Sequence, residues 1–340
     1  MDGIEAFVAR LPKAELHVHL VGSASTATVL KLAERHPQSP VPRTEEELRE
    51  FYTFRDFPHF AAVYKMVKDL VTEQEDIADL VRGIARDLAA QNGRYAEVKV
   101  SPFGFVRNGI PRSAVTEALD VAADDSLSQH GVRIGYLFEF PGEHAGEHAA
   151  PTLEHALALA PKALVGFGIG GIEQARAPHQ DVIRDVFGAA SAAGLHCVPH
   201  AGEMTGPEAV WEAVRHLHAK RIGHGINCMR DPRLVAYLSE RQLPLEVSPT
   251  SNVCTGQVSS LSQHPLPRML EAGLNVTLNS DDPPMFGTTL SNEYLVAASV
   301  LGLSRSQLAA LSANAVRASF LDAPAKEELL TEIAAVAPPS

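Results

Sequence analysis

The sequence predicts a single (β/α)₈ barrel, mainly because strand-like and helix-like segments alternate along almost all of its 340 residues. Eight short apolar runs are typical of parallel strands, at 14–20, 95–101, 133–140, 164–169, 196–201, 221–225, 244–248 and 275–279. Helical patterns lie between them, for example at 76–91, 111–129, 181–193, 207–218 and 231–240, and several begin with Asp or Pro, as helices often do. Strands alternating with helices indicate parallel βα units, and eight such units fit a barrel. A doubly wound open sheet is the alternative, but no glycine-rich dinucleotide fingerprint follows any strand to favour it.

A long segment, residues 22–93, separates the first two predicted strands. Its aromatic residues recur at helical spacing: Phe51, Tyr52, Phe54, Phe57, Phe60 and Tyr64. This spacing predicts a helical insert that buries its own apolar stripe. An insert at this place would also serve as a lid that offers aromatic surface to a planar ligand. Because the chain shows no internal repeat or linker, we expect one domain over residues 1–340 that carries this helical lid.

Composition excludes several classes of partner. The formal net charge is −12, so the surface repels nucleic-acid phosphates and we expect no nucleic-acid partner. No apolar stretch reaches the ~20 residues of a membrane span, and Met1–Glu5 lacks the basic start of a signal peptide. The cysteines, Cys197, Cys228 and Cys254, are odd in number, which argues against a disulfide framework. These features predict a cytoplasmic protein without a membrane partner.

Two adjacent carboxylates, Asp281 and Asp282, follow the last predicted strand. Neighbouring strand residues point to opposite faces, and a buried carboxylate needs a metal or a cation as partner. His17 and His19 lie two residues apart on the first strand, so their imidazoles share one face and form half a metal site. His200 ends the fifth strand, and in a barrel all these residues lie at the carboxyl-terminal rim. Three imidazoles and Asp281 therefore predict a Zn²⁺ site.

Two further residues lie where acid–base chemistry would need them. His224 ends the sixth predicted strand and is placed to orient or deprotonate a water molecule. Glu203 follows His200 by three residues and is placed to donate a proton to a substrate. A bound Zn²⁺ lowers the pKa of its water to about 7. Each residue alone would be ordinary, but the set at the ends of separate strands indicates a metal-dependent hydrolase.

Residues 144–148 match the His-x-x-Glu-His pattern of one class of metalloproteases. That pattern requires a helix, and Pro141, Gly142 and Gly146 interrupt this segment. We therefore interpret it as a polar loop rather than a metal site. The cysteines also lack the Pro-Cys-x-x-Cys pattern of the cytidine-type zinc deaminases.

Five motifs in a fixed order span most of the chain: LPKAELHVHL at 11–20, HAGE at 200–203, RIGHG at 221–225, SPTSN at 248–252 and LNSDDP at 278–283. This set resembles the adenosine and adenine deaminase family of the amidohydrolase superfamily. The resemblance implies a (β/α)₈ barrel with one Zn²⁺ per chain, held by His17, His19, His200 and Asp281. It also implies hydrolytic deamination of a 6-aminopurine nucleoside to the 6-oxopurine and ammonia.

The resemblance further implies roles for individual residues. His224 and Asp281 position or deprotonate the water that attacks C6 of the purine. Glu203 protonates N1, which makes the ring electrophilic. Asp282 forms a hydrogen bond with N7, and a backbone N–H near Gly171 meets N3.

The sequence departs from the family pattern at Val21. Family members usually have an acid two residues after the second histidine, here His19, where it binds the ribose 5′-hydroxyl. Valine accepts no hydrogen bond, and a buried unpaired hydroxyl costs roughly 1–3 kcal/mol. One hypothesis is therefore a 5′-modified substrate such as 6-aminodeoxyfutalosine, a menaquinone precursor with a carbon chain and a benzoate. We expect His19 and Val21 to contact the substrate and Arg107 to meet the carboxylate.

Three other hypotheses stay open. The enzyme would be an adenosine or adenine deaminase of purine salvage if another group serves the ribose. A two-metal amidohydrolase commonly has a modified lysine on its fourth strand, and residues 164–169 contain none. A catalytically silent purine-binding protein would need a damaged site, whereas every residue that the family motifs require is present.

Overall fold

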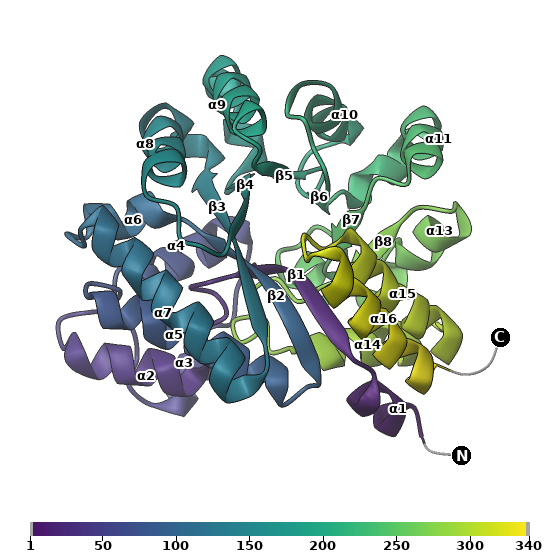
Figure 1. The fold of residues 1–340 in the computed structure, drawn as a ribbon, viewed down its shortest axis with the longest axis horizontal. Coiled ribbons are helices and arrows are strands. Elements are labelled where there is room, and N and C mark those ends of the chain that lie inside the picture. Colours follow the sequence, from purple (N-terminus) through teal and green to yellow (C-terminus); the bar gives the residue numbers. More distant parts are fainter. Residues whose placement is uncertain (1–2, 338–340) are drawn as a thin grey trace.

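The computed structural model describes residues 3–337 and shows eight parallel strands in a nearly closed barrel, with helices around it (Figure 1). The strands pair in chain order from β1 to β8. They are β1 Lys13–His19, β2 Gly93–Val100, β3 Arg133–Pro141, β4 Leu164–Gly170, β5 His196–Ala201, β6 Ile222–His224, β7 Leu245–Val247 and β8 Val276–Leu278. Each strand lies within two residues of its predicted position, so the predicted fold class is confirmed.

The two ends of the sheet meet at a bridge between Val18 of β1 and Asp281, just beyond β8. The N–H of His19 donates to the carbonyl of Asp281 at 3.0 Å, and the N–H of Asp281 donates to the carbonyl of His17 at 2.9 Å. The hydrogen bonds that close the barrel therefore hold two histidines and an aspartate side by side.

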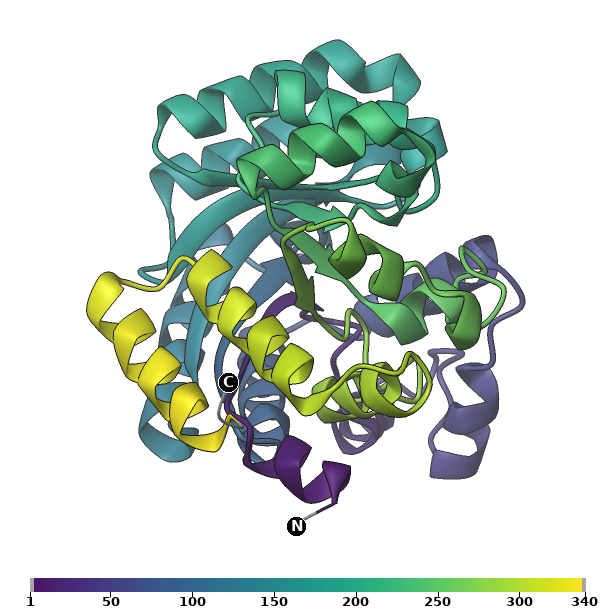
Figure 2. The same cartoon turned by 90° about the vertical axis from the view of Figure 1, so that its right-hand side faces the viewer.

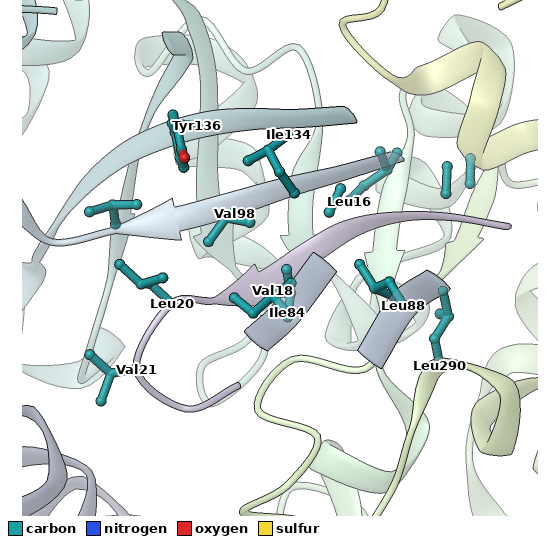
Figure 3. Close-up of a cluster of buried hydrophobic side chains, with 14 of the residues drawn as sticks. Leu16, Val18, Leu20, Val21, Ile84, Leu88, Val98, Ile134, Tyr136 and Leu290 are labelled. Atoms are coloured by element: carbon teal, nitrogen blue, oxygen red, sulfur yellow. The ribbon is translucent and has the colours of Figure 1, made fainter. Parts of the chain in front are cut away.

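The alternation of side chains along β1 decides which way these histidines point. Leu16, Val18 and Leu20 point into a cluster of buried apolar side chains that includes Ile84 and Val98 (Figure 3). Successive strand residues point to opposite faces, so His17 and His19 face the barrel interior. Apolar packing outside the sheet thus fixes the orientation of the polar residues inside it.

The five helices predicted between strands are present as α5 Gln74–Ala89, α7 Arg112–His130, α9 Gln180–Ala192, α10 Pro207–His216 and α11 Pro232–Arg241. The others outside the segment after β1 are α1 Ile4–Arg10, α6 Pro102–Arg107, α8 Ala145–Ala158, α12 Pro249–Cys254, α13 Leu266–Glu271, α14 Leu290–Ser299, α15 Arg305–Ala318 and α16 Ala323–Val336. Figure 2 shows the last helices, in yellow, near the purple amino-terminal segment. Helix α15 packs against both β8 and β1 and so covers the outside of the closure. No helix within residues 3–337 is long and apolar enough to span a membrane.

The segment after β1 is helical, with α2 Thr26–Arg35, α3 Glu45–Phe51 and α4 Phe57–Lys68 ahead of α5. Helix α5 packs against α7 in the outer ring, so the part that departs from the barrel pattern ends near α4. Part of the aromatic stripe forms a cluster in which the ring of Phe60 lies 5.3 Å from that of Phe54 and 5.1 Å from that of Phe286. Because Phe286 lies in the loop after β8, this contact joins α4 to the region of Asp282.

The polar loop expected at 144–148 is wrong, because a 3₁₀ turn at Gly142–His144 leads directly into α8. Pro141 precedes the turn, and Gly146 lies in the first turn of the helix. The first N–H groups of a helix have no partner within it, so a proline or glycine at this end costs little helical stability. In the sequence these residues resemble helix breakers, but in the structure they mark the start of a helix.

Candidate active site

Four side chains converge at the carboxyl end of the barrel: His17, His19, His200 and Asp281. Asp281 Oδ1 lies 3.4 Å from His17 Nε2 and 3.2 Å from His19 Nε2. His200 Nε2 lies 3.3 Å from His19 Nε2. His17 Nε2 is buried without a hydrogen-bond partner, and such atoms are rare unless another group satisfies them. His17, His19 and His200 form one group whose ligand atoms lie within 4.8 Å of one another, and Asp281 belongs to two overlapping groups, one with His17 and His224 and one with His19 and Asp282. These imidazole nitrogens and carboxylate oxygens fit a divalent metal ion.

Two of these histidines are oriented by buried carboxylates. His17 Nδ1 lies 2.8 Å from Glu246 Oε2, and His19 Nδ1 lies 2.9 Å from Glu139 Oε1. A histidine that donates its Nδ1–H to a carboxylate leaves Nε2 free to bind a metal. Neither acid is among the residues predicted from the sequence. Each is the one carboxylate in a mainly apolar strand, β7 or β3, and that isolation was the available sign.

Glu246 also belongs to a buried ion network beneath the metal cluster, which consists of the candidate metal ligands His17, His19, His200 and Asp281. Lys99 Nζ lies 3.2 Å from Glu246 Oε2, and Arg221 Nε donates to Glu246 Oε1 at 2.6 Å. Arg221 also pairs with Glu97. Burial by itself would raise the pKa of Glu246, but Lys99, Arg221 and His17 hold it well below its usual value. The carboxylate that orients His17 is therefore ionised.

Glu203 and His224 lie beside the metal cluster. His224 Nε2 is 3.6 Å from Glu203 Oε2 and 3.8 Å from Asp281 Oδ2. Burial, with the charge of Asp281 adding to it, raises the pKa of Glu203 well above its usual value. Burial also lowers the pKa of His224 to about 3. The site therefore contains a protonated carboxyl and a neutral imidazole, which is a suitable pair for acid–base chemistry at neutral pH.

His224 and Asp281 share a strained backbone conformation, with φ of +59° and +66°. A non-glycine residue in this left-handed region costs about 1–3 kcal/mol. His224 ends β6 and Asp281 lies three residues beyond β8, and both side chains line the cavity at the mouth of the barrel. Ser251 of α12 holds Asp281 there by donating its hydroxyl to Oδ2 at 2.6 Å. Nothing in the sequence pattern marked these positions as strained.

Asp282 also reaches the cavity, and its Oδ1 is buried without a hydrogen-bond partner. Burial raises the pKa of Asp282 well above its usual value, and the neighbouring Asp281 adds to this effect. Gly22 makes room for this carboxyl group, because a Cβ at Gly22 would overlap it. An unused carboxyl oxygen facing a cavity is suited to binding a ring nitrogen of a ligand.

A cavity of about 440 Å³ opens over these residues, within the range of small-molecule sites. Its lining contains most of the predicted site residues: His19, Arg107, Gly171, His200, Glu203, His224, Asp281 and Asp282. His17 is fully buried behind them. Val21 packs into the apolar cluster of Figure 3 and is not among the lining residues. The expected contact between Val21 and the substrate therefore stays a prediction.

Gly171 lies at the cavity wall with φ of +74°, a conformation that favours glycine. A Cβ at this position would overlap the carboxylate of Glu143, which accepts a hydrogen bond from the N–H of Ile172 at 2.9 Å. His148 from the 144–148 motif contacts Arg107 at 3.4 Å. Within residues 3–337, the groups of side chains close enough to hold a metal consist of His17, His19, His200, His224, Asp281 and Asp282, and none includes a residue of this motif.

The model of the adenosine deaminase family matches residues 12–336. The chain belongs to the adenosine deaminase family. It is accordingly a hydrolytic deaminase, and the predicted family and enzyme class are confirmed.

Individual relatives cover nearly the whole chain. The sequence is 49% identical to an aminodeoxyfutalosine deaminase of Streptomyces coelicolor, over 97% of this chain and 85% of that protein. The fold is similar to that of an adenine deaminase of Arthrobacter aurescens, with a TM-score of 0.91, 33% identity, and coverage of 96% of this chain and 98% of that one. An amidohydrolase of Burkholderia ambifaria solved with bound zinc has a TM-score of 0.87 at 27% identity, over 98% of this chain and 93% of that one.

Proposed function

We propose that this enzyme deaminates 6-aminodeoxyfutalosine, a 5′-modified 6-aminopurine nucleoside of menaquinone biosynthesis, in the cytoplasm. The observation that carries the proposal is the 49% identity to an aminodeoxyfutalosine deaminase over 97% of the chain. The shape of the site is consistent with it, because the cavity extends beyond the metal cluster along α4 to the basic side chains of Lys68 and Arg107.

One Zn²⁺ per chain fits the donor set: His17, His19 and His200 would be ligands, together with Asp281, whose Oδ1 lies 3.4 Å from His17 Nε2 and 3.2 Å from His19 Nε2. The similar fold of a zinc-bound amidohydrolase supports this choice of metal. A zinc ion at this position supplies the Lewis acidity that makes water nucleophilic at neutral pH. Ligands from β1, β5 and the end of β8 would hold it at the inner end of the cavity.

Each side chain around this cluster has a separate role toward the purine. Glu203 donates its proton to N1, so that negative charge does not build up on the ring when water attacks C6. His224 and Asp281 hold the attacking water between them. Asp282 binds N7, for which its unpartnered Oδ1 is available, and the backbone N–H at Gly171 meets N3. Ammonia leaves and the 6-oxopurine remains.

Two further contacts complete the proposal. His19 lines the cavity as well as the metal cluster and so lies beside the reacting end of the substrate. Arg107 is at the cavity wall contributed by α6, where a carboxylate on the 5′ side of the nucleoside would approach it. Helix α4 lines this part of the cavity, and we propose that it acts as a lid.

Steady-state kinetics of the zinc-loaded enzyme test the substrate. We expect kcat/KM for 6-aminodeoxyfutalosine to exceed that for adenosine and for adenine by at least about 100-fold, because a substrate that fills the cavity gains binding energy along its whole length. A preference for adenosine of similar size would refute the proposal. Elemental analysis checks the metal, with one zinc per chain expected and two pointing to a two-metal amidohydrolase.

Adenine deamination is the second candidate, since a solved adenine deaminase shares this fold with a TM-score of 0.91. Adenine would occupy the inner end of the cavity and leave the region beside Lys68 and Arg107 empty. The same assay separates the two functions, because an adenine deaminase would gain nothing from the 5′ substituent. A silent binding protein would release no ammonia from any of the three compounds.

A further inference from the structure

One face of α4 forms a wall of the cavity from its metal end to its far end. Phe57, Phe60, Tyr64 and Lys68 line the cavity, and their spacing of three to four residues places them on one side of the helix. Phe60 packs against Phe286, four residues after Asp282, so the start of α4 is near the purine end. Lys68 lies one helical turn beyond Tyr64, ~6 Å further along the axis. Its Nζ sits 3.5 Å from the position of a Cβ on Gly104 of α6.

Lys68 differs from the other basic residues of this wall because its charge is unpaired. Arg107 lies 3.3 Å from Glu147, and Lys65 pairs with Asp69. Among residues 3–337, Lys68 Nζ has no ion pair within 4 Å and no hydrogen bond, and the carboxylates of Asp69 and Glu143 act on it only through longer-range charge. Burial lowers the pKa of Lys68. A partly buried ammonium with no carboxylate in contact is costly, and an anionic ligand would reduce that cost.

We infer that Lys68 binds the carboxylate of the substrate's 5′ arm, an inference that rests on the proposed function. The wall between Asp282 and Lys68 is aromatic, which suits an aryl carboxylate whose ring packs on α4. A nucleoside 5′-phosphate offers the same anionic chemistry, but it would leave a polar phosphate ester, and not an aryl ring, against the aromatic wall beside Tyr64. Arg107, already engaged by Glu147, is then a neighbour of the anion and not its main partner.

The test compares Lys68→Met with wild type on 6-aminodeoxyfutalosine and on its methyl ester. A charge-assisted hydrogen bond contributes about 1.5–3 kcal/mol, so we expect the substitution to reduce kcat/KM for the acid by roughly 10- to 150-fold. With the wild-type enzyme, kcat/KM for the ester should be lower than kcat/KM for the acid by a similar factor. Lys68→Met should lower kcat/KM for the ester little further. The matched control is Lys31→Met, which removes an exposed lysine paired with Asp79 away from the cavity lining.

Two outcomes would overturn the inference while leaving the proposed function intact. In the first, Lys68→Met lowers kcat/KM for the acid and for the ester by the same factor. In the second, the wild-type enzyme has the same kcat/KM for the acid and the ester, although both are better substrates than adenosine. A wild-type preference for AMP that Lys68→Met abolishes would assign the site to a phosphate and would also overturn the carboxylate. A wild-type preference for adenosine would instead refute the proposed function.

A chain of buried hydrogen bonds leads from α13 to His224. The backbone N–H of Leu266, at the start of α13, donates to His264 Nδ1 at 3.1 Å. His264 Nε2 lies 3.2 Å from Asn252 Oδ1, and Asn252 Nδ2 lies 3.2 Å from His224 Nδ1. These four residues are all buried. Burial also lowers the pKa of His264 to about 4, so its ring is neutral.

The direction of every hydrogen bond in this chain follows from its first member. A backbone N–H only donates, so His264 Nδ1 accepts and the proton of the neutral ring is on Nε2. That proton goes to Asn252 Oδ1, which leaves the amide NH₂ to donate to His224 Nδ1. The opposite orientation of the Asn252 amide would require His264 to have no proton on either nitrogen.

The geometry points to Asn252 and His264 as positioning residues that keep the proton of His224 on Nε2. That nitrogen faces Glu203 and Asp281. His224 therefore donates a hydrogen bond to the attacking water and does not take its proton.

Long-range ¹H–¹⁵N NMR of the imidazoles in the zinc-loaded enzyme tests this assignment directly. We expect an Nε2–H tautomer for both His224 and His264.

Asn252→Asp presents an acceptor to His224 Nδ1, so the proton should move there and kcat should fall by roughly 10²- to 10⁴-fold, as for a catalytic histidine held in the wrong tautomer. KM should change less than about 3-fold. His264→Gln keeps a donor toward Asn252 and should retain both the tautomer and most of kcat. An Nδ1–H signal for His224 in wild type, or full kcat in Asn252→Asp, would overturn the inference.

Discussion

At the scale of single residues, the site depends on what lies behind each functional group. The Nδ1 atoms of His17 and His19 each meet a carboxylate, and Ser251 holds Asp281. Residue type and strand position predicted the groups that face the cavity. The residues that hold them in place, Glu139 of β3, Glu246 of β7 and Ser251 of α12, could not be assigned from the sequence. Only the three-dimensional arrangement shows which of these residues contacts which ligand.

Glu203 gives the site its expected pH dependence. Its pKa is raised by burial, so the carboxyl keeps its proton at neutral pH. The protonated form is the one that can donate to N1. We therefore expect kcat/KM to be high below this raised pKa and to fall as the pH rises through it, measured by ammonia release across a pH series.

Replacing the acid tests the same role. Glu203→Gln keeps the shape of the side chain but has no acidic proton, and general acid catalysis contributes about 10²- to 10⁴-fold. We expect a loss of kcat in that range, and the alkaline decline assigned to Glu203 should disappear. Zinc content should stay at the wild-type level, because Glu203 is not a proposed ligand. Undiminished ammonia release would show that another group protonates the purine.

At the scale of elements, the alternation of apolar runs with helical patterns was sufficient to predict all eight strands. The alternation of side chains along β1 predicted that His17 and His19 share one face. Neither pattern revealed the left-handed backbone conformation of His224 and Asp281, which lie at or beyond the ends of strands. The segment 144–148 was predicted wrongly for a different reason, because the same Pro and Gly residues that break a helix can also precede one.

The loop after β1 and the end of β8 meet at Gly22 and Asp282, which gives a test of their packing. A Cβ at Gly22 would overlap the Asp282 carboxyl, while the backbone of Gly22 itself is not in the left-handed region. Gly22→Ala should therefore displace Asp282 and little else. A displacement of about 1 Å at a reacting site costs roughly 10²-fold in rate, so we expect a loss of that size in kcat/KM for 6-aminodeoxyfutalosine.

Gly188→Ala is the matched control, because a Cβ at that helical position meets no atom within 4 Å. It should retain wild-type kcat/KM, while Gly22→Ala should keep its zinc. Equal activity of the two variants would mean that the Asp282 carboxyl tolerates displacement, and the proposed contact with N7 would then be wrong.

At the scale of the whole molecule, the barrel interior beneath the metal cluster is charged. Arg221, 1% exposed, joins Glu97 of β2 to Glu246 of β7. Removing one partner of a buried ion pair leaves an uncompensated charge and destabilises a protein by about 3–5 kcal/mol. We expect Arg221→Met to lower the free energy of unfolding by that amount in urea titrations.

A second effect of Arg221→Met would reach the metal cluster, because Glu246 also orients His17. Zinc affinity should fall along with stability. Arg184→Met is the control, since Arg184 pairs with Glu212 at the surface and such pairs contribute little. If Arg221→Met behaved like this control, the buried network would have no structural role.

Removing the metal should loosen the barrel where its two ends meet. Asp281 supplies both the hydrogen bonds to β1 that close the sheet and a proposed zinc ligand, so the ion would tie β8 to β1 through side chains as well as through the backbone. A ligand that binds only the folded state stabilises it by RT ln(1 + [L]/Kd), about 2.7 kcal/mol at 100 times Kd.

Chelation should therefore lower the melting temperature, and amide hydrogen exchange should become faster first at His19 and Asp281. Exchange that rises evenly over all eight strands would contradict this, because it would place the effect of the metal on the fold as a whole and not at the closure. Re-addition of zinc should restore both protection and ammonia release.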